Sequence, residues 1–84
     1  MNLTLIEFPP YPEIDVAATG TRIRVLREQS GISVDAFARY LHLSGTRSVY
    51  YWFSGKTLPS VDNLFAMSRL FQVPINDILV EKAA

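Results

Sequence analysis

The side chains best suited to contact a partner lie on a short predicted helix near the middle of the chain. Arg47, Ser48 and Tyr51 fall within residues 46–54, a segment with the spacing of a helix. At 100° per residue, Arg47 and Tyr51 lie opposite the apolar Val49, with Ser48 at the edge. Arginine can donate two hydrogen bonds to guanine, serine can bond several bases, and an α-helix fits the major groove of DNA. The pattern therefore predicts a surface able to read base edges.

Each of these residues also has a purely structural interpretation. The alternative for Arg47 is a solvated surface side chain, and the alternative for Tyr51 is an exposed ring packed on Arg47. As a contact residue, Tyr51 would touch a thymine methyl group or a phosphate. Thr46 and Ser48 could serve only to cap the helix. Lys56, in the loop after the helix, is placed to bind a phosphate.

Composition excludes several other kinds of site. The chain has no cysteine and a single histidine, His42, so disulfides, thiolate metal sites, cysteine nucleophiles and multi-histidine metal sites are ruled out. No catalytic Ser–His–Asp order and no glycine-rich phosphate loop stands out. Asp35, Asp62 and Asp77 lie at predicted helix starts, where a carboxylate favours the helix dipole. We expect no catalytic residue, no cofactor, no metal and no enzymatic activity.

The net charge of zero hides an uneven distribution along the chain. Residues 20–56 carry six basic and two acidic residues, whereas residues 1–19 carry three acidic and no basic residues. Such asymmetry is compatible with a polyanionic partner. From charge alone, a mixed solvated surface is the simpler explanation.

An ordered set of helices must position these side chains. The chain has 84 residues, of which 49% are hydrophobic, so it predicts one small packed domain. Asp15, Ser33 and Ser60 are predicted N-caps, and Gly31 and Gly55 are predicted helix ends. Helices are expected over residues 15–30, 33–42 and 46–54, from residue 60 to before Pro74, and over residues 75–80. The predicted inward stripes contain Val16, Thr19, Ile23, Leu26, Ser30, Phe37, Ala38, Leu41, Val49, Trp52, Leu64, Met67 and Phe71.

The domain is expected to span residues 14–80. Residues 1–13 are predicted to form an extended arm because three prolines follow one another closely, and residues 81–84 are predicted to fray. Gly20 inside the first helix costs roughly 1 kcal/mol relative to alanine unless close packing requires it. The fourth helix is apolar over most of its circumference, which suggests contact with a partner as well as with the core.

The second and third predicted helices have the spacing of a helix-turn-helix motif. Residues 19–80 resemble the Cro/XRE-type helix-turn-helix family of bacterial and phage transcriptional regulators, and in particular its small single-domain Firmicutes members. The resemblance rests on the runs 22–28, 31–33, 49–60 and 70–74, together with Phe37, Ala38, Leu41, Leu64, Ile78 and Leu79.

This resemblance implies an all-α, five-helix, lambda-repressor-like domain that binds double-stranded DNA. It implies base contacts from Thr46, Arg47, Ser48 and Tyr51. It implies phosphate contacts from Ser33, Ser54, Lys56 and Thr57. It also implies a homodimer on a palindromic operator, with half-sites about one helical turn apart.

Three features depart from the family pattern. Val34 stands where the family usually has a glutamine that bonds a phosphate. Phe53 stands where the family often has a glutamate that pairs with an arginine of the first helix, so Arg27 needs another partner or faces solvent. The turn before the third helix is one residue longer than in the usual family pattern, which could change the direction in which the Arg47 side chain points.

These departures keep a rival function open. The rival is a protein-interaction module, such as an antitoxin or an adaptor, on the same scaffold with little or no DNA binding. A domain that has lost DNA binding altogether is a third possibility. No apolar run approaches the ~20 residues of a membrane span, and no signal peptide is visible, so the cytoplasm is the expected location.

Overall fold

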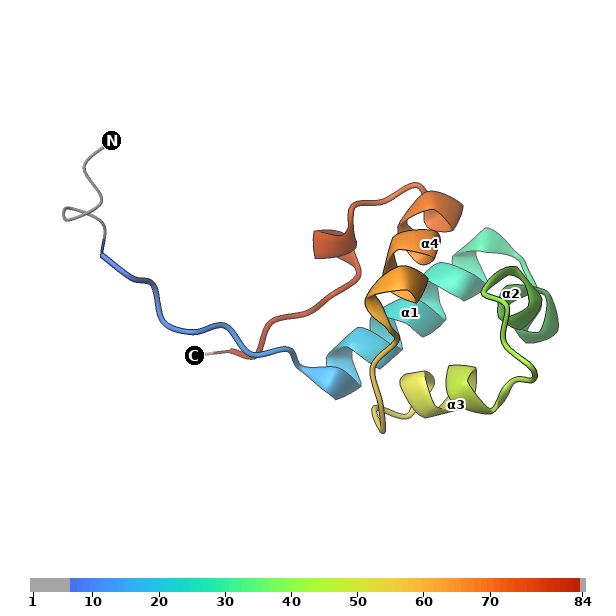
Figure 1. Ribbon diagram of the computed structural model, residues 1–84, viewed down its shortest axis with the longest axis horizontal. Helices are drawn as coiled ribbons and strands as arrows, with labels where there is room; N and C mark the ends of the chain where they lie inside the picture. The colour runs from blue at the N-terminus through green and yellow to red at the C-terminus, as the bar shows by residue number, and fades with distance from the viewer. Residues whose placement is uncertain (1–6, 84) are drawn as a thin grey trace.

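The computed structural model describes residues 7–83; the other residues of the predicted arm (1–6) and of the predicted frayed end (84) lie outside this range. Helices α1 (Val16–Ser30), α2 (Val34–Tyr40), α3 (Arg47–Phe53) and α4 (Val61–Phe71) are followed by the 3₁₀ turn η2 (Ile75–Asp77). Figure 1 shows α1 running through the molecule with the other helices packed around it. The prediction of an all-α fold is confirmed, with four α-helices in place of five.

The fifth predicted helix is a single 3₁₀ turn because the chain after it makes tertiary hydrogen bonds. The Val80 amide donates to the Thr19 hydroxyl oxygen at 2.9 Å, and the Val80 carbonyl accepts from the Asp15 amide at 2.7 Å. These backbone groups are therefore not available to a helical ladder. Thr19 is fully buried, so this hydroxyl is part of the interior of the fold.

Side-chain caps at three helix starts follow the sequence prediction. Asp15 accepts a hydrogen bond from the Ala18 amide at 2.9 Å, Ser33 from Ala36 at 3.0 Å, and Ser60 from Asn63 at 3.1 Å. Each bond satisfies an amide that has no partner within its own helix. At the other end of α1, Gly31 has a φ of 77° and closes the helix in the left-handed conformation.

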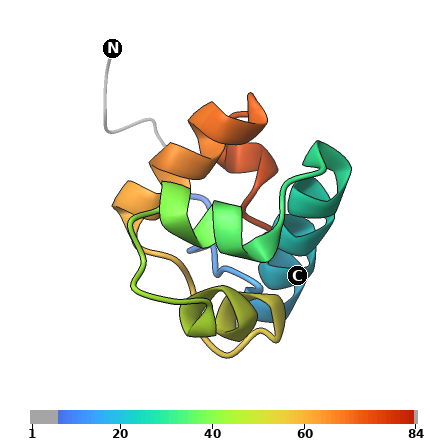
Figure 2. The ribbon, with the colours of Figure 1, turned by 90° about the vertical axis from the view of Figure 1, so that its right-hand side faces the viewer.

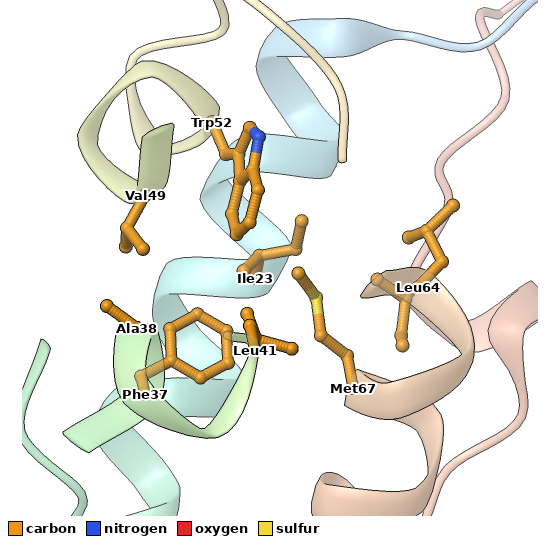
Figure 3. Packing of buried hydrophobic residues seen from close by; sticks show 9 residues of the cluster. Ile23, Phe37, Ala38, Leu41, Val49, Trp52, Leu64 and Met67 are labelled. Atoms are coloured by element: carbon orange, nitrogen blue, oxygen red, sulfur yellow. The ribbon is translucent and has the colours of Figure 1, made fainter. Parts of the chain in front are cut away.

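The hydrophobic core lies where α1, α2, α3 and α4 meet, and Figure 3 shows its side chains converging from all four helices. The ring of Phe37 packs edge-on against Trp52, with centroids 6.5 Å apart. It also packs against Phe71 in a tilted arrangement, with centroids 5.6 Å apart. Of the predicted inward residues, Val16, Leu26 and Phe71 are only partly buried and Ser30 is exposed. The buried set is Ile23, Phe37, Ala38, Leu41, Val49, Trp52, Leu64, Met67 and Ile78.

The two ends of the described chain run antiparallel to each other next to the domain (Figure 1). Ile14 and Glu81 form an isolated β-bridge, and the Lys82 amide donates to the Glu13 carbonyl at 2.9 Å. Residues 81 and 82, which the sequence placed in a frayed end, are thus held next to the arm, Glu81 by the β-bridge and Lys82 by its backbone hydrogen bond. Before this pairing, Phe8 and Tyr11 are more than 90% exposed on the arm. None of the helices within residues 7–83 combines the length and the apolar character of a membrane span.

Candidate nucleic-acid interface

Helix α3 is held against α1 by one buried side and one glycine. Val49 and Trp52 are buried, and both point toward the core in Figure 3. A Cβ atom at Gly20 of α1 would lie 1.8 Å from the carbonyl oxygen of Trp52. The close approach of the two helices therefore requires glycine at this position, which is the packing reason that the sequence analysis left open.

The other side of α3 faces solvent. Arg47 and Tyr51 are exposed, and Thr46 and Ser48 are half-buried at the start of the helix. Tyr50 is also exposed, and its ring contacts Phe53 edge-on at 5.9 Å. Val49 and Trp52 thus anchor the helix while Arg47 and Tyr51 are accessible to a partner.

The loop after α3 is organised around Tyr51. The Tyr51 carbonyl accepts hydrogen bonds from the amides of Lys56 at 2.9 Å and Thr57 at 3.4 Å, and from the Ser54 hydroxyl at 3.1 Å. The Lys56 ammonium lies 4.8 Å from the centre of the Tyr51 ring. Tyr51 therefore packs on Lys56, whereas the structural alternative from sequence paired it with Arg47.

These bonds leave the predicted phosphate-binding groups in different states. The Ser54 hydroxyl already donates its hydrogen to Tyr51, so it would have to turn before donating to a phosphate. Ser33 accepts a hydrogen bond from the Ala36 amide, which leaves its own hydroxyl hydrogen free to donate. The ammonium of Lys56 keeps its donors while it contacts the ring.

The turn before α3 has no comparable set of contacts. His42 takes the left-handed conformation with a φ of 59°, so the strained position of the turn is His42 and not Gly45. Thr46 occupies the N-cap position of α3, yet its side chain caps no amide within residues 7–83. Leu43 to Ser48 line a surface hollow of about 380 Å³, which includes the start of α3.

The cations around α3 are not neutralised by neighbouring carboxylates. Residues 36–60 contain no aspartate or glutamate. Arg39, Arg47 and Lys56 are exposed and take part in no salt bridge within the described residues. Arg39, at the end of α2, was not among the predicted site residues, because the motif pattern alone does not select it. The surface formed by α3 and its flanking loops is therefore positively charged.

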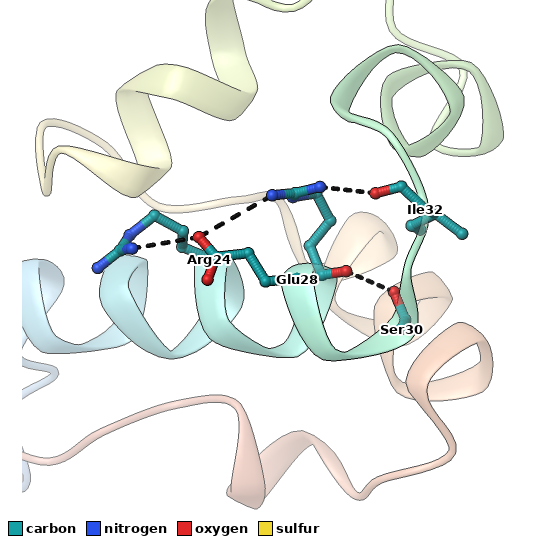
Figure 4. A network of polar contacts seen from close by, with 5 residues as sticks. Arg24, Glu28, Ser30 and Ile32 are labelled. Atoms are coloured by element: carbon teal, nitrogen blue, oxygen red, sulfur yellow. Dashed lines mark hydrogen bonds and ion pairs between the residues drawn. The ribbon is translucent and has the colours of Figure 1, made fainter.

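The arginines of α1 are engaged within the protein. Arg24 pairs with Glu28 at 3.2 Å (Figure 4). The Arg27 guanidinium donates a hydrogen bond to the Ile32 carbonyl at 2.6 Å. Arg22 donates to the Asp77 carbonyl at 2.6 Å. Arg27 has thus found a backbone partner in place of the glutamate that the family places where Phe53 stands. Val34, the other departure, is half-buried and packs against the core.

Comparison with known proteins agrees with this architecture. No curated protein matches the chain significantly. The chain is similar in fold to the restriction-modification controller protein C.AhdI from Aeromonas hydrophila, with a TM-score of 0.67 and 22% identity over 76% of this chain and 96% of that one. It is also similar to the hypothetical transcription factor NHTF from Neisseria, with a TM-score of 0.66 and 18% identity over 89% of this chain and 88% of that one.

The helix-turn-helix family profile matches residues 23–78, which include α2, the turn and α3. The match covers well over half of the chain, and the arrangement of α1 to α4 supports it. The protein belongs to the Cro/XRE-type helix-turn-helix family of DNA-binding transcriptional regulators.

Proposed function

We propose that the protein is a sequence-specific DNA-binding transcriptional regulator that places α3 in the major groove. One observation carries this proposal. Arg47 and Tyr51 are exposed on a helix whose opposite side is anchored by Val49 and Trp52, in a stretch of chain free of carboxylates. An exposed, anchored and positively charged helix meets the requirements of a groove-binding element.

The side chains at the start of α3 have the chemistry to read bases. Arg47 can donate two hydrogen bonds to a guanine, and Thr46 and Ser48 can bond several bases. The Thr46 side chain is not used as a cap, so its hydroxyl group is available to a base or a phosphate. Tyr51 lies one turn further along the same side and is the fourth proposed base contact.

Phosphate contacts would set the position of α3 in the groove. Ser33 precedes the helix-turn-helix motif in the sequence as the N-cap of α2, and Lys56 and Thr57 follow the motif after α3. Ser54 is the fourth proposed contact and requires its hydroxyl to turn. Since Val34 replaces a phosphate-binding glutamine and cannot hydrogen-bond, we expect Ser33 to be the main contact from the start of α2.

A domain with a single recognition helix reads only a few base pairs. We therefore propose that two copies bind a palindromic operator, with half-sites about 34 Å apart along the DNA. A second candidate function, a protein-interaction module, is favoured by the exposed apolar residues Val61 and Phe65 on α4. The two functions differ in one outcome, which is whether the folded protein selects DNA sequences.

The test is selection of bound sequences from a random pool of DNA, followed by a salt titration on the selected site. We expect a palindromic consensus, and a log–log slope that falls by about 0.9 for each phosphate contact removed. Lys56→Ala removes one contact from each of the two copies, so it should lower the slope by about 1.8 and weaken all sequences equally. Lys82→Ala is the matched control, because Lys82 is an exposed lysine that pairs with Glu13 at the far end of the chain. Absence of any enriched sequence from folded protein would contradict the proposal.

A further inference from the structure

The outward side of α4 carries apolar and charged residues that lie outside the buried core. Val61, Asp62, Phe65 and Arg69 lie within an arc of about 100° around the helix axis, and all four are exposed. Val61 is 77% exposed and Phe65 is 52% exposed. We call these four residues the α4 face. Val61 and Phe65 are one helical turn apart, so their side chains form one continuous exposed apolar patch.

The charges of the α4 face stand at its two ends. Asp62 lies in the first turn of α4 and Arg69 in the last turn, seven residues or about 10 Å apart along the axis, with Phe65 between them. The guanidinium of Arg69 lies 5.1 Å from the centre of the Phe65 ring. Neither charge forms a salt bridge within residues 7–83. An acidic end and a basic end around an apolar centre make this surface complementary to itself.

We infer that the α4 face binds the α4 face of a second copy of this chain. A two-fold axis near Phe65 would run the two helices antiparallel, so that each Asp62 meets the partner's Arg69 and the two phenylalanines meet at the centre. A two-fold contact uses the same patch on both copies, which is the condition that this distribution of charge satisfies. A parallel pairing would instead place like charges together. This inference extends the proposed homodimer by naming its surface.

The contact is expected to be weak without DNA. Four side chains per copy cover less than the ~800 Å² per partner of a standard interface. Two linked half-sites on one DNA raise the effective concentration of the second copy, so the dimer should form more readily on an operator. Figure 2 shows α3 and α4 on separate sides of α2, which leaves α3 uncovered when a copy binds on α4.

The experiment exchanges charges between the two ends of the face. Asp62→Arg and Arg69→Asp are prepared separately and examined by sedimentation velocity without DNA, up to about 1 mM protein, where weak dimers are populated. We expect a wild-type monomer–dimer equilibrium, and a rise of tenfold or more in the dissociation constant for each variant alone. Mixing the two variants should restore association, because both contacts of the mixed dimer then pair opposite charges. Recovery on mixing is specific to a face in which position 62 meets position 69.

Asp35→Arg is the matched control. It reverses an exposed aspartate in the first turn of α2, with the same effect on a helix dipole, but lies outside the α4 face. Helical circular dichroism checks the folding of each variant, and Phe65→Glu supplies a second disruption that leaves the helix ends unchanged. A monomeric wild type at every concentration, a dimer insensitive to all three α4 variants, or a mixture that stays monomeric would overturn the inference. Half-site DNA binding by the variants is measured in parallel, so a failed dimer and a failed DNA-binding proposal give different results.

Discussion

The two ends of α3 are held in very different ways. At its C-terminal end, the Tyr51 carbonyl accepts three hydrogen bonds from the following loop, and a Cβ atom on Gly55 would lie 2.7 Å from the Cα of Ala17. At its N-terminal end, Thr46 makes no capping bond, and a Cβ atom at Gly45 would meet open space. The end with the proposed phosphate contacts is therefore fixed by the fold. The N-terminal end, with three of the four proposed base contacts (Thr46, Arg47 and Ser48), is free to vary at little cost in stability.

The largest expected difference is in the stability lost when two glycines are replaced by alanine, one under α3 and one in the turn before it. Gly20→Ala should lower the free energy of unfolding by about 3 kcal/mol or more, because the new methyl group meets a backbone carbonyl that cannot move alone. Gly45→Ala should change it by no more than about 1 kcal/mol, since the site is open and Gly45 does not have a positive φ. Urea denaturation of both variants measures the two values. Similar losses at the two positions would show that the turn is as tightly constrained as the helix contact.

A smaller difference in lost stability is expected when the residues at the N-cap positions of α4 and α3 are replaced by alanine. Ser60→Ala should cost about 1 kcal/mol, because it removes the acceptor of the Asn63 amide at the start of α4. Thr46→Ala should cost less than about 0.5 kcal/mol, since the Thr46 side chain caps no amide. Thermal unfolding followed by circular dichroism compares the two. A loss at Thr46 equal to that at Ser60 would mean that α3 depends on its threonine, and the contrast between the two ends of α3 would disappear.

The smallest effect concerns the ring that contacts Lys56. Tyr51→Leu should weaken DNA binding by about 0.5–1 kcal/mol, roughly two- to fivefold, because it removes both the aromatic face that contacts the Lys56 ammonium and the ring of the proposed base contact. Tyr51→Phe keeps the ring and should bind DNA as the wild type does. Fluorescence anisotropy on the selected site resolves these changes. If Tyr51→Phe binds as weakly as Tyr51→Leu, the hydroxyl group itself contacts DNA.

Most of the fold follows from local patterns in the sequence. Asp15, Ser33 and Ser60 cap helices because a short polar side chain before an apolar stripe satisfies a free amide, and this needs no tertiary information. The buried positions on α2 and α3 follow from helical periodicity in the same way. The prediction of a fifth helix was wrong because Val80 forms hydrogen bonds with Thr19 and Asp15, more than sixty residues away in the sequence. Helical periodicity does not detect such bonds.

The candidate site was predictable only in part. The outward position of Arg47 and Tyr51 follows from the buried position of Val49 on the same helix. The contact between Lys56 and Tyr51 depends on the path of the loop through Gly55, whose positive φ of 76° and contact with Ala17 are tertiary features. The hydrogen bond from Arg27 to the Ile32 carbonyl could not be predicted from the sequence either, because it depends on how the chain turns after α1.

The position of Arg47 on α3 is tested most directly by comparing the DNA sequences selected by the wild type and by Arg47→Ala. We expect a loss of about 1–3 kcal/mol for each half-site, which relaxes selection at one base position in that half-site and leaves the rest of the consensus unchanged. Arg24→Ala is the control, because Arg24 is also an exposed arginine but pairs with Glu28 on α1. An unchanged consensus with Arg47→Ala, or an equal effect of Arg24→Ala, would contradict the assignment of α3 as the helix that reads bases.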